Sequence, residues 1–282
     1  MSVKQLKSVD ISSYTIIATG ISVLASVILA IIMVVGIGVL VPNSFAVIGY
    51  LIPTIIFGAM ICSIFIYFSE SYLYNILTMK LKGISFDIDD EGCIKSISTT
   101  QTAFVVAIIS LILSTVVYLA SSFLLPIMLS SVVQTLMFTG QSAVAYSLYQ
   151  ILIVISNPVT IAIGIIGFFI INFVFTLLGS YIYNILGSSE RGVKVTLSKE
   201  DNLTILESID SVSLGVASGT IALILNIIVG VIMIISGYEV FNALTTILGG
   251  FAGVFIGAIL LAIFYNLLAP RLGKLKIELI DI

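Results

Sequence analysis

The chain has 282 residues, of which 60% are hydrophobic and only 9% are charged. Soluble domains are roughly 45–50% apolar and about 25% charged, so this composition excludes an ordinary soluble protein and predicts a polytopic membrane protein. The sequence has no His and only two Cys, Cys62 and Cys93, which excludes His-ligated metals and four-thiolate zinc sites. Acidic residues outnumber basic ones 14 to 11, so we expect no nucleic-acid partner. We also expect no cofactor, no metal and no catalytic residue.

Six stretches are apolar over the roughly 20 residues that a helix needs to cross a membrane. In chain order they are residues 14–40, 45–68, 102–125, 159–185, 214–236 and 241–268. The first is interpreted as a retained span, because no small-residue cleavage site follows it.

The 11 Lys and Arg residues predict the orientation of these spans. All of them fall in the segments on one side of the predicted spans, and the opposite loops, residues 41–44, 126–158 and 236–242, contain none. Because Lys and Arg are enriched in cytoplasmic loops, we predict a multi-pass protein of the cell membrane with both termini in the cytoplasm.

The same pattern occurs three times along the chain. Spans two, four and six end in similar Tyr-Asn segments, at residues 72–77, 181–186 and 263–268. A short run with apolar residues at every second position follows each of them, at residues 84–88, 193–197 and 275–279. This alternation is typical of half-buried strands. Spans one, three and five follow similar segments that end in Asp10, Ser98 and Asp210, residue types that favour helix N-caps.

We therefore predict an all-α polytopic membrane protein with six transmembrane helices in three pseudo-equivalent two-helix units, with short cytoplasmic β-hairpins. The units are residues 1–88, 89–197 and 198–282, within one integral membrane domain. The strand at residues 274–280 is expected to pair with residues 3–9 and to close the units into a ring. Unit two carries an outer helical insertion, residues 126–158, which would lie on the outer surface or dip into the bilayer.

This pattern resembles a small family of two-span transmembrane domains of unknown function, found at the C-termini of actinobacterial membrane proteins. The matching residues are Tyr265-Asn266-Leu267, the segment 273–279 and Val9-Asp10 before the first span. The resemblance implies three tandem copies over nearly the whole chain. The family has no established activity, so the resemblance implies a fold and no function.

The repeated Tyr-Asn pairs are the first candidate site: Tyr74 and Asn75, Tyr183 and Asn184, and Tyr265 and Asn266. Asn is common just past helix ends, where it hydrogen-bonds free backbone groups, and Tyr favours the membrane interface. We interpret the pairs as structural clamps between helix and strand. The alternative is a ring of polar groups at a cytoplasmic pore mouth.

Glu70 is the second candidate, because it interrupts the repeat: Gly179 and Leu261 occupy the equivalent positions. An ionisable residue inside a span is a functional hypothesis by default, although a residue near a helix end can reach the headgroups. Glu70 is therefore either an interfacial carboxylate or a site for a proton or a cation.

Small residues mark two predicted helix-packing faces, with Gly215 and Gly219 on the fifth span and Gly249, Gly253 and Gly257 on the sixth. Glycines four residues apart let membrane helices approach closely. The contact would be either within the chain or between copies of it.

These features favour a non-catalytic integral membrane scaffold or complex subunit, with the cytoplasmic β-cluster as its docking surface. The expected partners are the lipid bilayer and a protein bound at the cytoplasmic face or at the outer hairpin. The alternative is a channel or uncoupled permease with a pathway between the repeat units. An integral membrane enzyme ranks third. The acidic run from Asp87 to Glu91 is interpreted as a solvated turn, with a weak divalent-cation site as the sharper hypothesis.

Overall fold

The computed structural model describes residues 2–40, 45–138, 140, 142–200 and 203–282. Within these residues the helices are α1 (Ile11–Leu40), α2 (Phe45–Lys80), α3 (Thr99–Phe138), α4 (Ser142–Ser156), α5 (Pro158–Leu186), α6 (Ser211–Ile235) and α7 (Val240–Leu272), with a short π-helical turn, η1 (Gly187–Arg191), after α5. All except α4 are long and apolar enough to cross a membrane, so the described residues contain 6 candidate spans. This confirms the predicted number of spans. The predicted loop at residues 41–44 lies outside the described residues.

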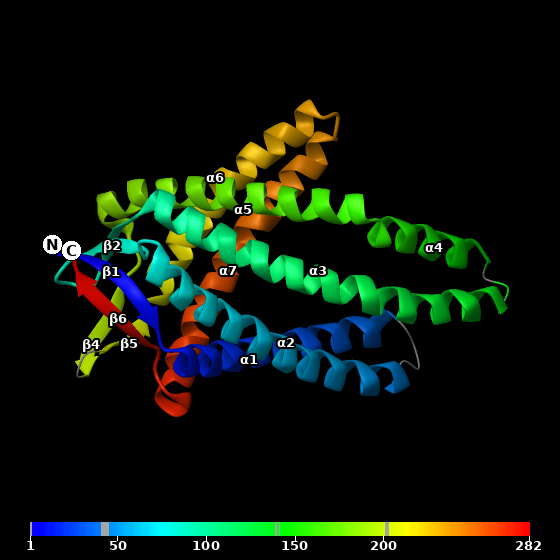
Figure 1. Ribbon diagram of the computed structural model, residues 1–282, viewed down its shortest axis with the longest axis horizontal. Helices are drawn as coiled ribbons and strands as arrows, with labels where there is room; N and C mark the ends of the chain where they lie inside the picture. Colours follow the sequence, from blue (N-terminus) through cyan, green and yellow to red (C-terminus); the bar gives the residue numbers. More distant parts are fainter. Residues whose placement is uncertain (1, 41–44, 139, 141, 201–202) are drawn as a thin grey trace. The chain divides into compact units, whose positions relative to one another are not determined.

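A six-stranded antiparallel sheet joins the helix ends. Its strands are β1 (Ser2–Val9), β2 (Ser85–Ile88), β3 (Ile94–Ile97), β4 (Val195–Glu200), β5 (Leu203–Ile209) and β6 (Lys276–Asp281). Their order in the sheet is β3-β2-β1-β6-β5-β4. Each lies at a segment where the sequence alternates apolar and polar residues, which lets a strand present one apolar and one polar face. Figure 1 shows both termini together at this sheet.

The first and last strands of the chain are neighbours at the centre of the sheet. In the β1–β6 pair, Leu6 lies opposite Leu279 and Val9 lies opposite Ile277. This is the pairing that the alternating patterns at the two ends of the sequence predicted. Backbone pairing therefore holds residues 277 and 279 beside the first strand of the chain.

The two edges of the sheet also meet. Cys93 and Lys194, which directly precede β3 and β4, form an antiparallel bridge. On either side of this bridge, the Ile94 N–H donates to the Val193 carbonyl at 2.9 Å and the Val195 N–H donates to the Gly92 carbonyl at 2.9 Å. The strands therefore form a closed cycle of neighbours. Closure satisfies backbone groups that an exposed edge would leave unpaired.

The chain divides into two compact units, and the larger consists of residues 1–105 and 177–282. In this unit α1 packs against α2, α6 packs against α7, and α7 also contacts α1. A small core forms around Ile17, Tyr265 and Ala269, which pack against Leu206 and Ile209 of β5 and against Leu275. Apolar side chains from α1, α7 and the sheet thus share one core at the junction of helices and strands.

The second unit is residues 106–176. It contains most of α3, all of α4 and the first part of α5. The predicted insertion is helical, but α3 passes through Pro126 without interruption and reaches Phe138. A helix of 40 residues is about 60 Å long, roughly twice the thickness of the hydrocarbon core. The first helix of the insertion is therefore a continuation of α3 and does not begin anew after Pro126.

The helix N-caps of the larger unit were predicted correctly at two of three places. The Asp10 carboxylate accepts a hydrogen bond from the Ser13 N–H at 2.7 Å, and Asp210 does the same for the Ser213 N–H at 2.7 Å. The Ser98 hydroxyl instead accepts the Ser85 N–H of β2 at 2.9 Å. Ser98 therefore connects a strand to the start of α3, because β2 offers a free N–H within reach.

Candidate functional site

Each of the three repeated asparagines binds both backbone groups of a single strand residue. The Asn75 side chain accepts the Val9 N–H and donates to the Val9 carbonyl, both at 2.8 Å. Asn184 binds the N–H and carbonyl of Ile97 at 2.8 and 2.9 Å, and Asn266 binds those of Ile209 at 2.9 and 2.8 Å. Val9, Ile97 and Ile209 are the last residues of β1, β3 and β5. Each carboxamide thus supplies the donor and acceptor that a neighbouring strand would have supplied.

The tyrosine before each asparagine bridges two strands. The Tyr74 hydroxyl donates to the Leu6 carbonyl at 2.7 Å and accepts the Ile84 N–H at 3.3 Å. The other two follow the same pattern: Tyr183 joins Ile94 to Val193 at 2.8 and 3.1 Å, and Tyr265 joins Leu206 to Leu275 at 2.5 and 3.2 Å. All three tyrosines are buried. These six side chains, which we call the Tyr-Asn joints, direct their polar atoms to backbone groups, as the clamp interpretation expects.

Glycines give the strands room at these joints. A Cβ on Gly83 would lie 2.3 Å from the Leu6 carbonyl oxygen, and one on Gly192 would lie 2.2 Å from the Ile94 carbonyl oxygen. These are the same two carbonyls that Tyr74 and Tyr183 bind. Lys274 takes the corresponding place in the third copy of the pattern, so the close approach is a feature of the first two.

Five ion pairs link residues in and beside the strands of the sheet. Between β1 and β6, Lys4 pairs with Asp281 at 2.9 Å and Lys7 pairs with Glu278 at 2.7 Å. Lys274 pairs with Glu207, Lys276 with Glu200 at 3.1 Å, and Lys95 with Asp89 at 3.2 Å. Hydrogen bonds from Lys7 and Ser8 hold the pKa of Glu278 below its ordinary value. Those from Lys274 and Ser198 lower the pKa of Glu207.

These lowered pKa values predict how stability depends on pH. The carboxylates of Glu207 and Glu278 stabilise the fold above their unfolded pKa of about 4.3, and this contribution is lost as the pH falls through their lower folded pKa. We expect the melting temperature of the detergent-solubilised protein to stay flat down to about pH 4 and then to fall by a few degrees, because exposed ion pairs contribute little. When both residues are replaced with Gln, the melting temperature should fall less below about pH 4. An unchanged fall in that variant would contradict the prediction.

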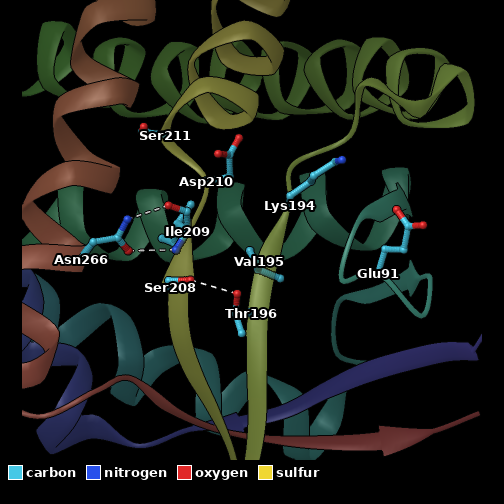
Figure 2. A pocket seen from close by; sticks show the side chains of 9 residues that line it. All are labelled: Glu91, Lys194, Val195, Thr196, Ser208, Ile209, Asp210, Ser211 and Asn266. Atoms are coloured by element: carbon cyan, nitrogen blue, oxygen red, sulfur yellow. Dashed lines mark hydrogen bonds between the residues drawn. The ribbon is translucent and has the colours of Figure 1, made fainter.

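Two grooves flank the turn between β2 and β3, at residues 89–92. One of about 480 Å³ is lined by Glu91, by β4 and β5, and by the start of α6. Figure 2 shows Asn266 at one side of it, bound to Ile209, and Lys194 and Glu91 at the other side. A second groove of about 420 Å³ lies between the turn, Lys4 and residues 195–197. Among the described residues, no three His, Cys, Asp or Glu side chains are grouped to hold a metal ion, which argues against the divalent-cation hypothesis for this turn.

Glu70 lies on α2, and the Tyr14 hydroxyl of α1 donates to its carboxylate at 3.0 Å. The sequence analysis identified Glu70 but not Tyr14, because no local pattern relates two residues on separate helices. The repeat could have pointed to Tyr14, because Thr102 and Leu214 stand at the equivalent positions in the other two copies. Both members of the Tyr14–Glu70 pair thus depart from the repeat.

The predicted glycine faces differ in their contacts. A Cβ on Gly215 would lie 2.5 Å from Ile259 and one on Gly219 would lie 3.0 Å from Phe255, so both face α7 closely. A Cβ on Gly249, Gly253 or Gly257 would meet no described atom within 4 Å. The sixth-span stripe is therefore not the surface that packs against α6. Gly250 faces α6 instead, with its Cβ position 2.5 Å from Asn226, because one residue along a helix turns the contact by about 100°.

The resemblance to two-span domains of unknown function rests on short motifs around Tyr265 and Gly273, and it stays a prediction. No known protein family, no curated protein and no solved structure matches this chain.

Proposed function

We propose that the protein is a non-catalytic integral membrane scaffold, or a subunit of a membrane complex, whose sheet docks a protein partner. The observation that carries this proposal is the acidic turn between the two grooves. Asp90 and Glu91 are exposed there, and neither takes part in the ion pairs of the described residues, whereas most acidic side chains of the sheet do. Unpaired charges beside a groove favour a partner of opposite charge, so the expected partner presents a basic segment.

The proposal places the sheet and both termini in the cytoplasm and the helices in the cell membrane. Its support is the distribution of Lys and Arg, none of which occurs in the segments between the far ends of the spans. A docking surface on the sheet would then be accessible to soluble proteins of the cytoplasm.

In this proposal the scaffold consists of three pseudo-equivalent two-helix units, residues 1–88, 89–197 and 198–282. The Tyr-Asn joints support it, because Tyr74 and Asn75 make the same set of backbone contacts as their two counterparts. The role of the joints is to fix the sheet to the inner ends of the helices, which keeps a docking surface rigid. Rigid elements hold a binding surface more precisely than loops do.

The test is co-purification of the full chain from native membranes in mild detergent. We expect a protein that co-purifies with the wild type to be lost at least tenfold from Asp90→Lys with Glu91→Lys, and to be retained by Glu239→Lys, a charge reversal in the exposed loop before α7. Added salt should weaken the same interaction, because salt screens exposed charges. Equal recovery with both variants would contradict the proposal. A lone species that conducts ions in liposomes would favour the channel instead.

A further inference from the structure

Glu70 is the one acidic residue within the 6 candidate spans. The nearest basic residue of its own helix, Lys80, ends that helix and lies about 15 Å further along the helix axis. Glu70 therefore differs from the acidic residues at the sheet and at the helix N-termini, such as Glu278 and Asp10.

The carboxylate belongs to a small polar cluster between α1 and α2. The Tyr14 hydroxyl donates to Glu70 Oε2 at 3.0 Å. The Tyr14 ring meets Tyr67 edge-on, with 5.9 Å between the ring centres, and the Tyr67 hydroxyl shares a hydrogen bond of 2.9 Å with Ser22. The other polar groups of this cluster are hydroxyls, which carry no positive charge, so none of them balances a negative charge.

Within the described residues, α1 and β1, which pack against α2, offer Glu70 no free counter-charge. Helix α1 contributes Tyr14, and β1 contributes Lys4 and Lys7, whose amines pair with Asp281 and Glu278. The Asp10 carboxylate at the start of α1 is itself acidic and caps that helix. Tyr67 and Tyr74 lie on α2 itself, and the Tyr74 hydroxyl binds strand backbone.

The second unit cannot supply a counter-charge in any position. Residues 106–176 contain no Asp, Glu, Lys, Arg or His. No side chain of residues 106–176 can therefore balance a negative charge on Glu70.

The repeated fold does not require the pair. Where Glu70 and Tyr14 stand in the first copy of the pattern, Gly179 and Thr102 stand in the second, and Leu261 and Leu214 stand in the third. The corresponding joints form without them, as the contacts of Asn184 and Asn266 show. A structural role shared by the copies therefore does not account for the carboxyl group.

We propose that Glu70 is a proton-binding site of the membrane domain and holds its proton at neutral pH. Glu70 is partly buried. An ionised carboxylate within a span and without a cation is costly, and taking up a proton removes the charge. The neutral acid keeps a hydrogen bond with Tyr14, since both groups then have an O–H and an acceptor oxygen. After the proton is released, the Tyr14 hydroxyl is the hydrogen-bond donor to the Glu70 carboxylate among the described residues.

Infrared spectroscopy of the full chain in dodecyl maltoside, a detergent without ester carbonyl groups, tests this proposal at pH 7. A protonated carboxyl group has a C=O stretch above the amide band, whereas a carboxylate does not. We expect this band in the wild type and in Glu239→Gln, a matched change of an acid outside the spans, and we expect its loss in Glu70→Gln. Tyr14→Phe should keep the band, because it removes a donor that favours the charged form.

A second measurement uses only the wild-type chain, in case Glu70→Gln does not fold. The O–H of a protonated carboxyl group adds across a C=N bond of dicyclohexylcarbodiimide, and the adduct rearranges to an N-acylurea without loss of atoms. We expect mass spectrometry to find this adduct on the peptide that contains Glu70 at pH 7, and to find less of it as the pH rises. A wild type without the infrared band and without the adduct would overturn the proposal, and would show an ionised interfacial carboxylate. Neither result depends on a protein partner, so failure here is separate from failure of the docking proposal.

Discussion

Replacement of Asn184 by Ala is expected to destabilise the fold by about 2–5 kcal/mol, because it leaves two backbone groups of Ile97 without their partner and an unsatisfied buried group costs about 1–3 kcal/mol. The side chain also donates to Thr99 at 3.1 Å. Asn75→Ala should have a similar effect. Asn266→Ala should have a smaller one, because Asn266 is exposed and water can replace its hydrogen bonds with Ile209.

Thermal unfolding in one detergent checks this prediction, with an expected fall in melting temperature of roughly 5–15 °C for Asn184→Ala. The matched control is Asn172→Ala. The Asn172 side chain is partly exposed, and its hydrogen bond among the described residues goes to the Phe168 carbonyl of its own helix, at 2.9 Å. A shift for Asn184→Ala no larger than that for the control would show that the Tyr-Asn joints do not hold the sheet.

A second large effect is expected for Gly92→Ala, at the closure between β3 and β4. Gly92 has a φ of +79°, and a Cβ there would lie 2.1 Å from the Val195 carbonyl oxygen. The left-handed conformation costs a non-glycine residue about 1–2 kcal/mol, and the collision with backbone adds about 1–3 kcal/mol. We expect the bridge between Cys93 and Lys194 to open, because the Val195 N–H bonds the Gly92 carbonyl.

Labelling of Cys93 with a water-soluble maleimide measures this opening. The Cys93 side chain is only 2% exposed, so in a Cys62→Ser background the parent should react slowly and Gly92→Ala should react at least tenfold faster. Two further variants separate the effect of the positive φ from the effect of the Cβ collision. Gly237→Ala tests the positive φ alone, since φ is +88° and nothing lies within 4 Å of its Cβ position. Gly192→Ala tests collision alone, since φ is −71°. Slow labelling of Gly92→Ala would contradict the prediction.

Much of the fold is predictable because it depends on local composition. The lengths of the apolar stretches predict six membrane helices, and a period of two predicts the strands within about three residues of their observed ends. The repeated Tyr-Asn pairs indicate that Asn75, Asn184 and Asn266 share one environment. Similar alternation at the two ends of the chain predicts the pairing of β1 with β6.

The contacts themselves are not predictable in this way. Asn75 and Val9 are 66 residues apart, and Tyr14 and Glu70 are 56 apart, so no local pattern relates the members of either pair. The same limit explains the Ser98 cap, since the sequence favours a helix cap but the fold brings the Ser85 N–H closer. It also explains the sixth-span stripe at Gly249, because spacing along a helix defines a face but not what the face meets.

The amino-acid sequence by itself therefore determined the number of spans, the strands and the residues that recur, because hydropathy and periodicity are properties of neighbouring residues. Only the tertiary structure decided that the asparagine side chains complete the strands, that the sheet closes at Cys93 and Lys194, and that the hydrogen-bond donor of Glu70 among the described residues is a tyrosine. These outcomes depend on which backbone groups remain unpaired once the helices and strands have packed together. That packing is set by contacts between residues far apart in the sequence.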